Sequence, residues 1–122
     1  MEPTDNIIAE KSKQFAIRIV NLYKYLLKEK KEFILSKQLV RSGTSIGANI
    51  AESKNAQSPA DFISKLSMAL KESGETEYWL KCLKESEYLS EKEFISIYSD
   101  NIEIGKMLTS SIVTMKKKHR IL

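Results

Sequence analysis

The residue types that most often carry out catalysis or bind metals are scarce in this chain of 122 residues. His119 is the only histidine and Cys82 is the only cysteine, so one chain cannot build a histidine-based triad or a multi-histidine or multi-cysteine metal site. Gly43 and Gly47 form a spaced pair, but a phosphate-binding G-x-x-x-x-G-K followed by Ser or Thr is absent. We therefore expect no enzyme, no cofactor and no bound metal, and we interpret Cys82 as a small buried hydrophobic residue.

A more informative set of polar residues is spaced for one face of a helix. The polar row consists of Arg41, Ser45, Asn49 and Glu52, which follow one another at intervals of four, four and three residues. Many of their neighbours are Gly, Ser and Ala, and Gly and Ser weaken a helix exposed to water, so we expect this face to be buried against another helix. A solvated row of ordinary surface residues is the alternative interpretation.

A buried Arg41 requires a carboxylate partner, because an unpaired charge in a protein interior is very costly. Glu52 lies about 16 Å further along the same helix, so the partner should come from another helix or another copy. Three glutamates of a later segment are candidates, namely Glu72, Glu75 and Glu77. We predict that the polar row forms a network with one or more of them, within a subunit or between the subunits of a homo-oligomer.

The net charge of +4 can be assigned to the basic tail, which consists of Lys116, Lys117, Lys118 and Arg120. The remaining lysines and arginines equal the 16 acidic residues in number, so the rest of the chain is balanced. One interpretation is that the tail offsets the negative end of a helix dipole and keeps the terminus soluble. In the other, several tails gathered in an oligomer bind the phosphates of RNA or DNA, assisted by Lys11, Lys13 and Arg18.

Helices must position these residues, because apolar residues recur at helical spacing along most of the chain and no segment reads as a strand. Ser58 and Ser90 are typical helix caps, since each hydroxyl precedes an acidic residue by three positions. Gly74 is a weak point of the third helix, where glycine costs about 1 kcal/mol relative to alanine. We predict one domain, residues 1–122, folded as an all-α antiparallel up-down four-helix bundle with helices at roughly 5–30, 36–55, 59–87 and 91–118.

The composition also bears on the compartment. A single cysteine cannot form an internal disulfide, which is compatible with a reducing setting. The first ten residues lack the order of a secretory signal, and no apolar stretch approaches the roughly 20 residues of a membrane span. We therefore expect a cytoplasmic protein that does not bind a membrane.

The segment around the polar row resembles a known family. The run Arg41-Ser42-Gly43-Thr44-Ser45-Ile46-Gly47-Ala48-Asn49-Ile50-Ala51-Glu52 is similar to the signature segment of four-helix-bundle proteins encoded in intervening sequences of bacterial 23S ribosomal RNA genes. The resemblance continues through Phe62 into residues 69–77 and covers most of the chain. It implies a four-helix protomer and a ring-shaped homopentamer. Related accessory proteins of diversity-generating retroelements look like basic pentameric barrels that bind nucleic acid and a reverse transcriptase.

Two functions from different classes follow. The first is an oligomeric scaffold that binds RNA or DNA through the basic tail, with steep salt dependence. The second is a structural or adaptor oligomer that binds a protein partner and no nucleic acid, which the balanced charge of the remaining chain favours. Tyr78 and Trp79 could stack on bases, although aromatic residues in helices are more often core or interface anchors. We favour the first function for its tail and family resemblance.

Overall fold

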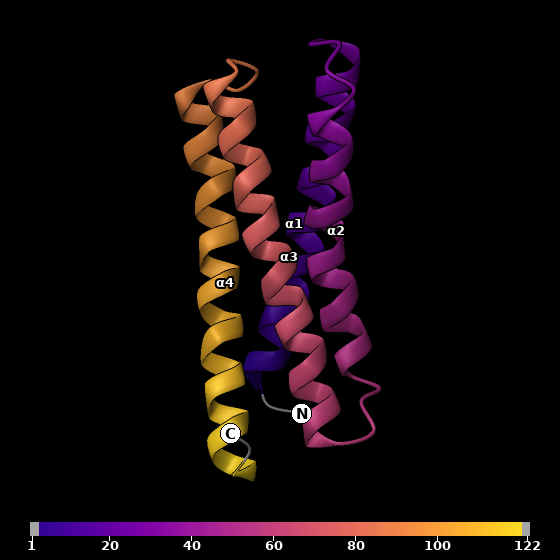
Figure 1. Ribbon diagram of the computed structural model, residues 1–122, viewed down its shortest axis with the longest axis vertical. Coiled ribbons are helices and arrows are strands. Elements are labelled where there is room, and N and C mark those ends of the chain that lie inside the picture. Colours follow the sequence, from indigo (N-terminus) through magenta and orange to yellow (C-terminus); the bar gives the residue numbers. More distant parts are fainter. Residues whose placement is uncertain (1–2, 121–122) are drawn as a thin grey trace.

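The computed structural model describes residues 3–120, with the side chains of residues 6–120. Four helices follow one another, α1 (Pro3–Lys28), α2 (Leu35–Ser53), α3 (Pro59–Glu85) and α4 (Glu91–His119). Successive helices run antiparallel and each packs against the next, while α4 returns to make the smallest contact, with α1 (Figure 1). The predicted all-α up-down bundle is confirmed, and each predicted helix end lies within two residues of the observed one.

The two serine caps start α3 and α4 in different ways. Ser90 Oγ accepts a hydrogen bond from the Glu93 amide, and the Glu93 carboxylate accepts one from the Ser90 amide, so the capping box is complete. Ser58 Oγ accepts from the Asp61 amide in the same way. The Asp61 carboxylate, however, reaches one residue further back, to the Gln57 amide at 3.1 Å. Both serines therefore satisfy amides that a helix start leaves without intrahelical partners.

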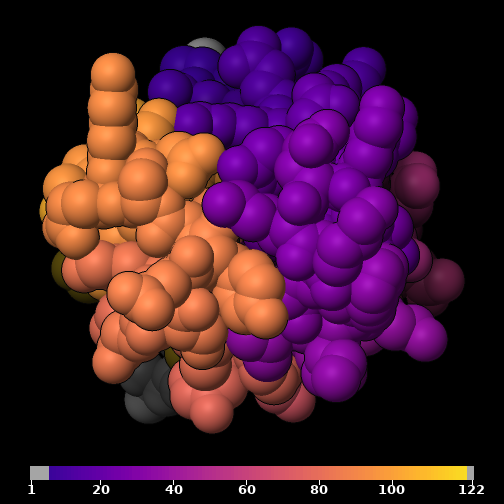
Figure 2. Space-filling view, turned by 90° about the horizontal axis from the view of Figure 1, so that it is seen from above, coloured from indigo at the N-terminus to yellow at the C-terminus, as the bar shows by residue number. Residues whose placement is uncertain are grey.

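The start of α2 is capped by a residue that the sequence does not mark. Glu32 is only 6% exposed, and its carboxylate accepts hydrogen bonds from the amides of Ile34, Leu35 and Ser36. Lys31, just before it, adopts a left-handed conformation with φ 56°. This turn leaves the side chains of Phe33 and Ile34 exposed at the end of the bundle that Figure 2 views from above, where the α1–α2 and α3–α4 connections lie side by side.

The core runs along the bundle axis and receives residues from all four helices. Its fully or almost fully buried members include Ile8, Phe15, Ile19, Leu26, Leu39, Ile46, Leu66, Leu80, Leu83, Ile104 and Leu108. Two polar pairs are buried with them. Thr76 Oγ1 lies 3.0 Å from Ser42 Oγ between α2 and α3, and Ser73 Oγ donates to Asn101 Oδ1 at 2.9 Å between α3 and α4. Each pair satisfies its polar atoms internally, which fixes the register of its two helices.

Two glycines bring α1 and α2 close together. A Cβ atom at Gly43 would lie 2.9 Å from two side-chain carbons of Ile19, and one at Gly47 would lie 3.2 Å from the Ser12 carbonyl oxygen. Both glycines have ordinary helical φ values, so their role is the close approach rather than a special backbone conformation. The small residues of α2 therefore serve the contact with α1.

Within residues 3–120, no helix is long and apolar enough to span a bilayer. Cys82 is half-buried in α3, less enclosed than the buried position expected for it.

Candidate functional site

Arg41 lies at the centre of an ion-pair cluster between α2 and α3. Its Nη1 donates to Glu72 Oε2 at 3.2 Å, and its Nη2 donates to Glu75 Oε1. Trp79 Nε1 also donates to Glu75 Oε1, at 3.4 Å. The hydrogen bond from Arg41 is the main cause that holds the pKa of Glu75 below its ordinary value. Arg41 therefore stabilises the charged form of Glu75, and the cluster is assembled within one protomer.

The other members of the polar row do not join this cluster. Ser45 Oγ donates to the Arg41 carbonyl at 2.6 Å, and Asn49 Nδ2 donates to the Ser45 carbonyl at 2.9 Å. Both side chains thus bond to their own helix. Glu52 instead faces Lys65 of α3, with 3.5 Å between the charged atoms. The row lies on one face of α2 as predicted, but its four residues make separate contacts.

Glu77, the third candidate carboxylate, belongs to the opposite side of α3. It pairs with Lys81 at 2.9 Å and accepts a hydrogen bond from the Tyr98 hydroxyl at 3.2 Å. The hydrogen bond from Lys81 is the main cause that lowers the pKa of Glu77. This residue therefore contacts α4 and plays no part in the cluster around Arg41.

The expectation that the polar row is buried is wrong for the single protomer. The Arg41 side chain is 50% exposed and that of Glu52 is 63% exposed. The error has a physical cause, because Gly43 and Gly47 point toward α1 and not toward the face that carries the row. The small residues therefore serve a different face of α2 from the one that carries the polar row. The row and its acidic partners form an outward-facing polar seam between α2 and α3.

The aromatic pair of α3 is divided between this seam and the solvent. Trp79 is half-buried and bonded to Glu75, while Tyr78 is 59% exposed. Their rings meet edge to face, with centroids 4.9 Å apart. Trp79 therefore holds the carboxylate that pairs with Arg41 from within α3, and the sequence did not reveal this bond to Glu75. Tyr78 remains accessible to another molecule.

The basic tail lies on the last turn of α4, at the end of the bundle where the chain begins and α2 connects to α3 (Figure 1). All four of its side chains are exposed. Arg120 ends the helix in a left-handed conformation with φ 52°, and its amide bonds the Lys117 carbonyl. The tail is remote from the ion-pair cluster around Arg41, which lies in the first half of α2, whereas Glu52 lies near the end of that helix. The predicted site residues thus form two separate groups.

The cations proposed to assist the tail are mostly engaged elsewhere. Lys11 Nζ pairs with Glu103 at 3.0 Å, and Arg18 Nη1 pairs with Asp100 at 2.7 Å, so both bridge α1 to α4. These pairs offset the two positive charges locally. Among the described residues, no group of three His, Cys, Asp or Glu side chains is arranged to hold a metal ion. The predicted site residues instead offer exposed positive charge on the basic tail and an exposed polar seam between α2 and α3.

Known proteins resemble this chain in both sequence and fold. No functionally curated protein matches the chain. A crystal structure of a protein of unknown function from the S23 ribosomal protein family of Bacteroides thetaiotaomicron has 58% sequence identity and a TM-score of 0.89, covering 89% of this chain and 97% of that one. The family model for the 23S rRNA-intervening sequence protein matches residues 4–110, which include the polar row and the two glutamates that pair with Arg41. The chain therefore belongs to the 23S rRNA-intervening sequence protein family.

Proposed function

We propose that this protein is a non-enzymatic cytoplasmic scaffold that assembles as a homo-oligomer, a pentameric ring, and binds RNA or DNA through its basic tail. The observation that carries the proposal is the basic tail itself, whose four exposed cations lie together on one helix end. Affinity for a polyanion grows with the number of phosphates that a protein neutralises, so one tail alone binds weakly. Gathering several tails on one particle supplies the missing contacts.

Assembly is supported by surfaces that a single protomer leaves open. The polar seam around Arg41 is half-exposed although it carries a tryptophan and two half-buried glutamates. In a closed ring, cyclic symmetry places every copy of the tail at the same end of the particle. The family resemblance implies five copies, and the relation that it implies to the accessory proteins of diversity-generating retroelements supports nucleic acid as the ligand.

Binding of fluorescently labelled single-stranded RNA and duplex DNA, measured at low and physiological salt, tests the proposal. The test variant has the four tail cations, Lys116, Lys117, Lys118 and Arg120, changed to glutamine. A matched control changes four exposed lysines near the opposite end to glutamine, Lys28, Lys30, Lys31 and Lys37. We expect salt-sensitive binding that the tail variant loses and the control retains, with the same mass in solution for all three proteins.

The alternative is an adaptor oligomer that binds a protein partner and no nucleic acid. The ion pairs of Lys11 and Arg18 with acidic residues favour it, because each pair offsets a positive charge that would otherwise assist the tail. An intact wild-type oligomer that binds neither RNA nor DNA at low salt would reject the nucleic-acid scaffold. That result would leave the adaptor as the supported function.

A further inference from the structure

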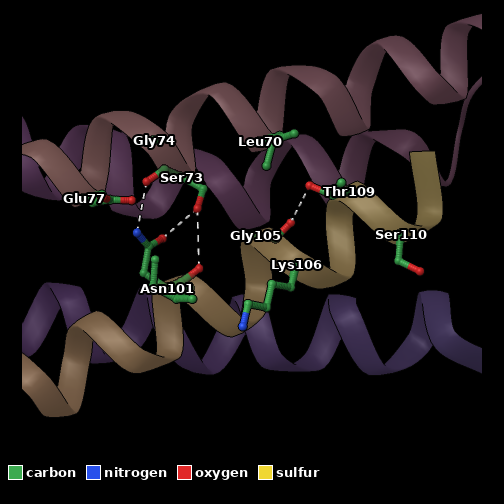
Figure 3. A pocket seen from close by; sticks show the side chains of 10 residues that line it. Leu70, Ser73, Gly74, Glu77, Asn101, Gly105, Lys106, Thr109 and Ser110 are labelled. Carbon is green, nitrogen blue, oxygen red and sulfur yellow. Dashed lines mark hydrogen bonds between the residues drawn. The ribbon is translucent and has the colours of Figure 1, made fainter. Parts of the chain in front are cut away.

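A hollow of about 620 Å³ lies on the outer side of the bundle between α3 and α4 (Figure 3). This α3–α4 hollow is lined mainly by Leu70, Gly74, Glu77, Ile102, Gly105 and Lys106. Its floor is closed by the hydrogen bonds between Ser73 and Asn101, which Figure 3 draws between the two helices. The surface is mostly apolar and open to solvent.

Two glycines keep the hollow open at a cost to the protomer. A Cβ at Gly74 would meet nothing within 4 Å, and one at Gly105 would make only an ordinary contact with Ser73 Oγ at 3.4 Å. Both lie inside long helices with ordinary helical φ values, where glycine costs about 1 kcal/mol relative to alanine. Unlike Gly43 and Gly47, these glycines serve no internal close approach. Their absent side chains leave room for something outside the protomer.

The rim indicates the character of the occupant. Tyr78 is 59% exposed and Val113 is 44% exposed, so apolar surface continues beyond the hollow along both helices. The lining carries one acid, Glu77, and one base, Lys106, and therefore no net charge. A polyanion gains nothing from such a surface. A protein surface with apolar residues and charges of both signs fits it.

We propose that the α3–α4 hollow receives the outer ridge of α1 from a second copy of this chain. The α1 ridge consists of Glu10, Ile17 and Lys24, which are spaced by seven residues and so lie along one line of the helix, facing away from the core. Ile17 is 54% exposed, so the middle of the ridge presents a large aliphatic side chain to the solvent. This proposal rests on the proposed homo-oligomer and assigns the surfaces that build it.

The charges of the two surfaces match when the copies stand side by side. The Lys11–Glu103 ion pair sets the level of α1 against α4. Glu10 lies one residue below this level and Lys106 three residues below it, a difference of about 3 Å at 1.5 Å per residue. An acid on the ridge therefore faces a base on the hollow at almost the same height.

A second match lies further up the bundle. The Ser73–Asn101 bonds set the level of α3 against α4. Counted from these bonds, Glu85 of α3 lies about 20 Å above the Lys11–Glu103 pair. Lys24 of α1 lies at about the same height. Between the two charge matches, Ile17 falls at about the level of Glu77 and of the exposed ring of Tyr78. No described residue forms an ion pair with the four charged residues of this match, Glu10, Lys24, Glu85 and Lys106.

The shapes of the two surfaces determine the kind of assembly. A hollow does not complement itself, so the hollow of one copy cannot pack against the hollow of another. Ridge and hollow are different surfaces, and each copy uses both. Such head-to-tail contacts generate a ring when the rotation between copies closes. The geometry of one protomer thus favours cyclic assembly.

Filling the hollow tests its role without damage to the protomer. Gly74→Leu places a side chain in open space and improves helix propensity, so we expect circular dichroism of an intact helical bundle and no loss of thermal stability. Its mass in solution, measured by sedimentation at equal concentration, should fall toward that of the single chain of 14.0 kDa. A wild-type mass for a folded Gly74→Leu variant would overturn the proposal.

A charge swap tests the register. We expect Glu10→Lys and Lys106→Glu each to weaken association by about tenfold or more, and the double variant to recover most of that loss. Lys92→Glu, at an exposed position near the start of α4, is the matched control and should leave the mass unchanged. A double variant that associates no better than the single variants would contradict the pairing. A wild-type protein that is monomeric at every concentration would reject the homo-oligomer itself along with this contact.

Discussion

Glu32 and Ser36 cap each other at the start of α2. The Ser36 amide donates to Glu32 Oε1 at 2.7 Å, and the Ser36 hydroxyl donates to the Glu32 carbonyl at 2.8 Å. The same carboxylate also accepts from two preceding amides, so one buried side chain satisfies three donors of a new helix. The orientation of α2, and with it the position of the polar row, depends on this turn.

Removing the cap should destabilise the protein. We expect Glu32→Ala to lower the free energy of unfolding by about 2 kcal/mol, because three amides lose their acceptor in a buried turn. Urea denaturation followed by circular dichroism measures the change. Glu29→Ala is the control, since Glu29 is exposed and its substitution should alter stability by less than about 0.5 kcal/mol. Equal effects of the two substitutions would show that the cap contributes little.

The cap should also make stability depend on pH. Burial alone would raise the pKa of Glu32, but hydrogen bonds from the amides of Ser36, Leu35 and Ile34 outweigh it and hold the pKa below its ordinary value of 4.5. The stabilisation from the charged carboxylate is therefore fully present above pH 4.5 and is lost as the pH falls through the lowered native value.

Comparison of the wild type with Glu32→Gln isolates this contribution. We expect the wild type to be the more stable protein at about pH 7 and the difference to shrink as the pH falls to about 3. Urea denaturation at each pH gives the two free energies. Other carboxylates titrate in both proteins alike, so they cancel in the difference. A difference that is constant across this range would exclude the charged cap as its source.

The helices were predictable because their signals are local. Apolar residues at helical spacing and the serine caps at Ser58 and Ser90 lie within a few residues of the elements they define. The start of α2 carries no such local signal, because Glu32 acts as a cap only when Lys31 turns into a left-handed conformation. That turn depends on the packing of the connection against the bundle, which single-residue preferences do not encode.

The candidate site was predictable in part for a similar reason. Helical spacing places the polar row on one face, and the need for a carboxylate partner points to Glu72 and Glu75, which do contact Arg41. Burial could not be read in the same way. The sequence shows that α2 is rich in small residues, but only the packed bundle shows that Gly43 faces Ile19 of α1.

The glycines of the bundle should respond to alanine with opposite signs. Gly43→Ala places a Cβ 2.9 Å from carbons of Ile19, which is fully buried, so we expect a loss of about 1–3 kcal/mol in the free energy of unfolding. Gly74→Ala meets no atom within 4 Å, and we expect a gain of about 0.5–1 kcal/mol from helix propensity. Urea denaturation at one low protein concentration compares them. A gain at both positions would mean that α1 and α2 can separate without cost.

The ion pairs of Arg41 predict the result of a charge reversal. Arg41→Glu places a third carboxylate beside Glu72 and Glu75, whose charges then repel one another across the α2–α3 contact. We expect a lower melting temperature, because the repulsion acts between two helices of one protomer. Adding Glu75→Arg to this variant should restore part of the loss, because it recreates an opposite pair at the same place.

A control separates this local effect from the change in net charge. Lys37→Glu makes the same reversal one turn earlier on α2, at an exposed residue that has no ion-pair partner among the described side chains. We expect its melting temperature and mass to match the wild type. If Arg41→Glu behaves like this control, the cluster seen around Arg41 contributes to neither folding nor assembly. If only Arg41→Glu is impaired and Glu75→Arg rescues it, the contact between the two helices is the cause.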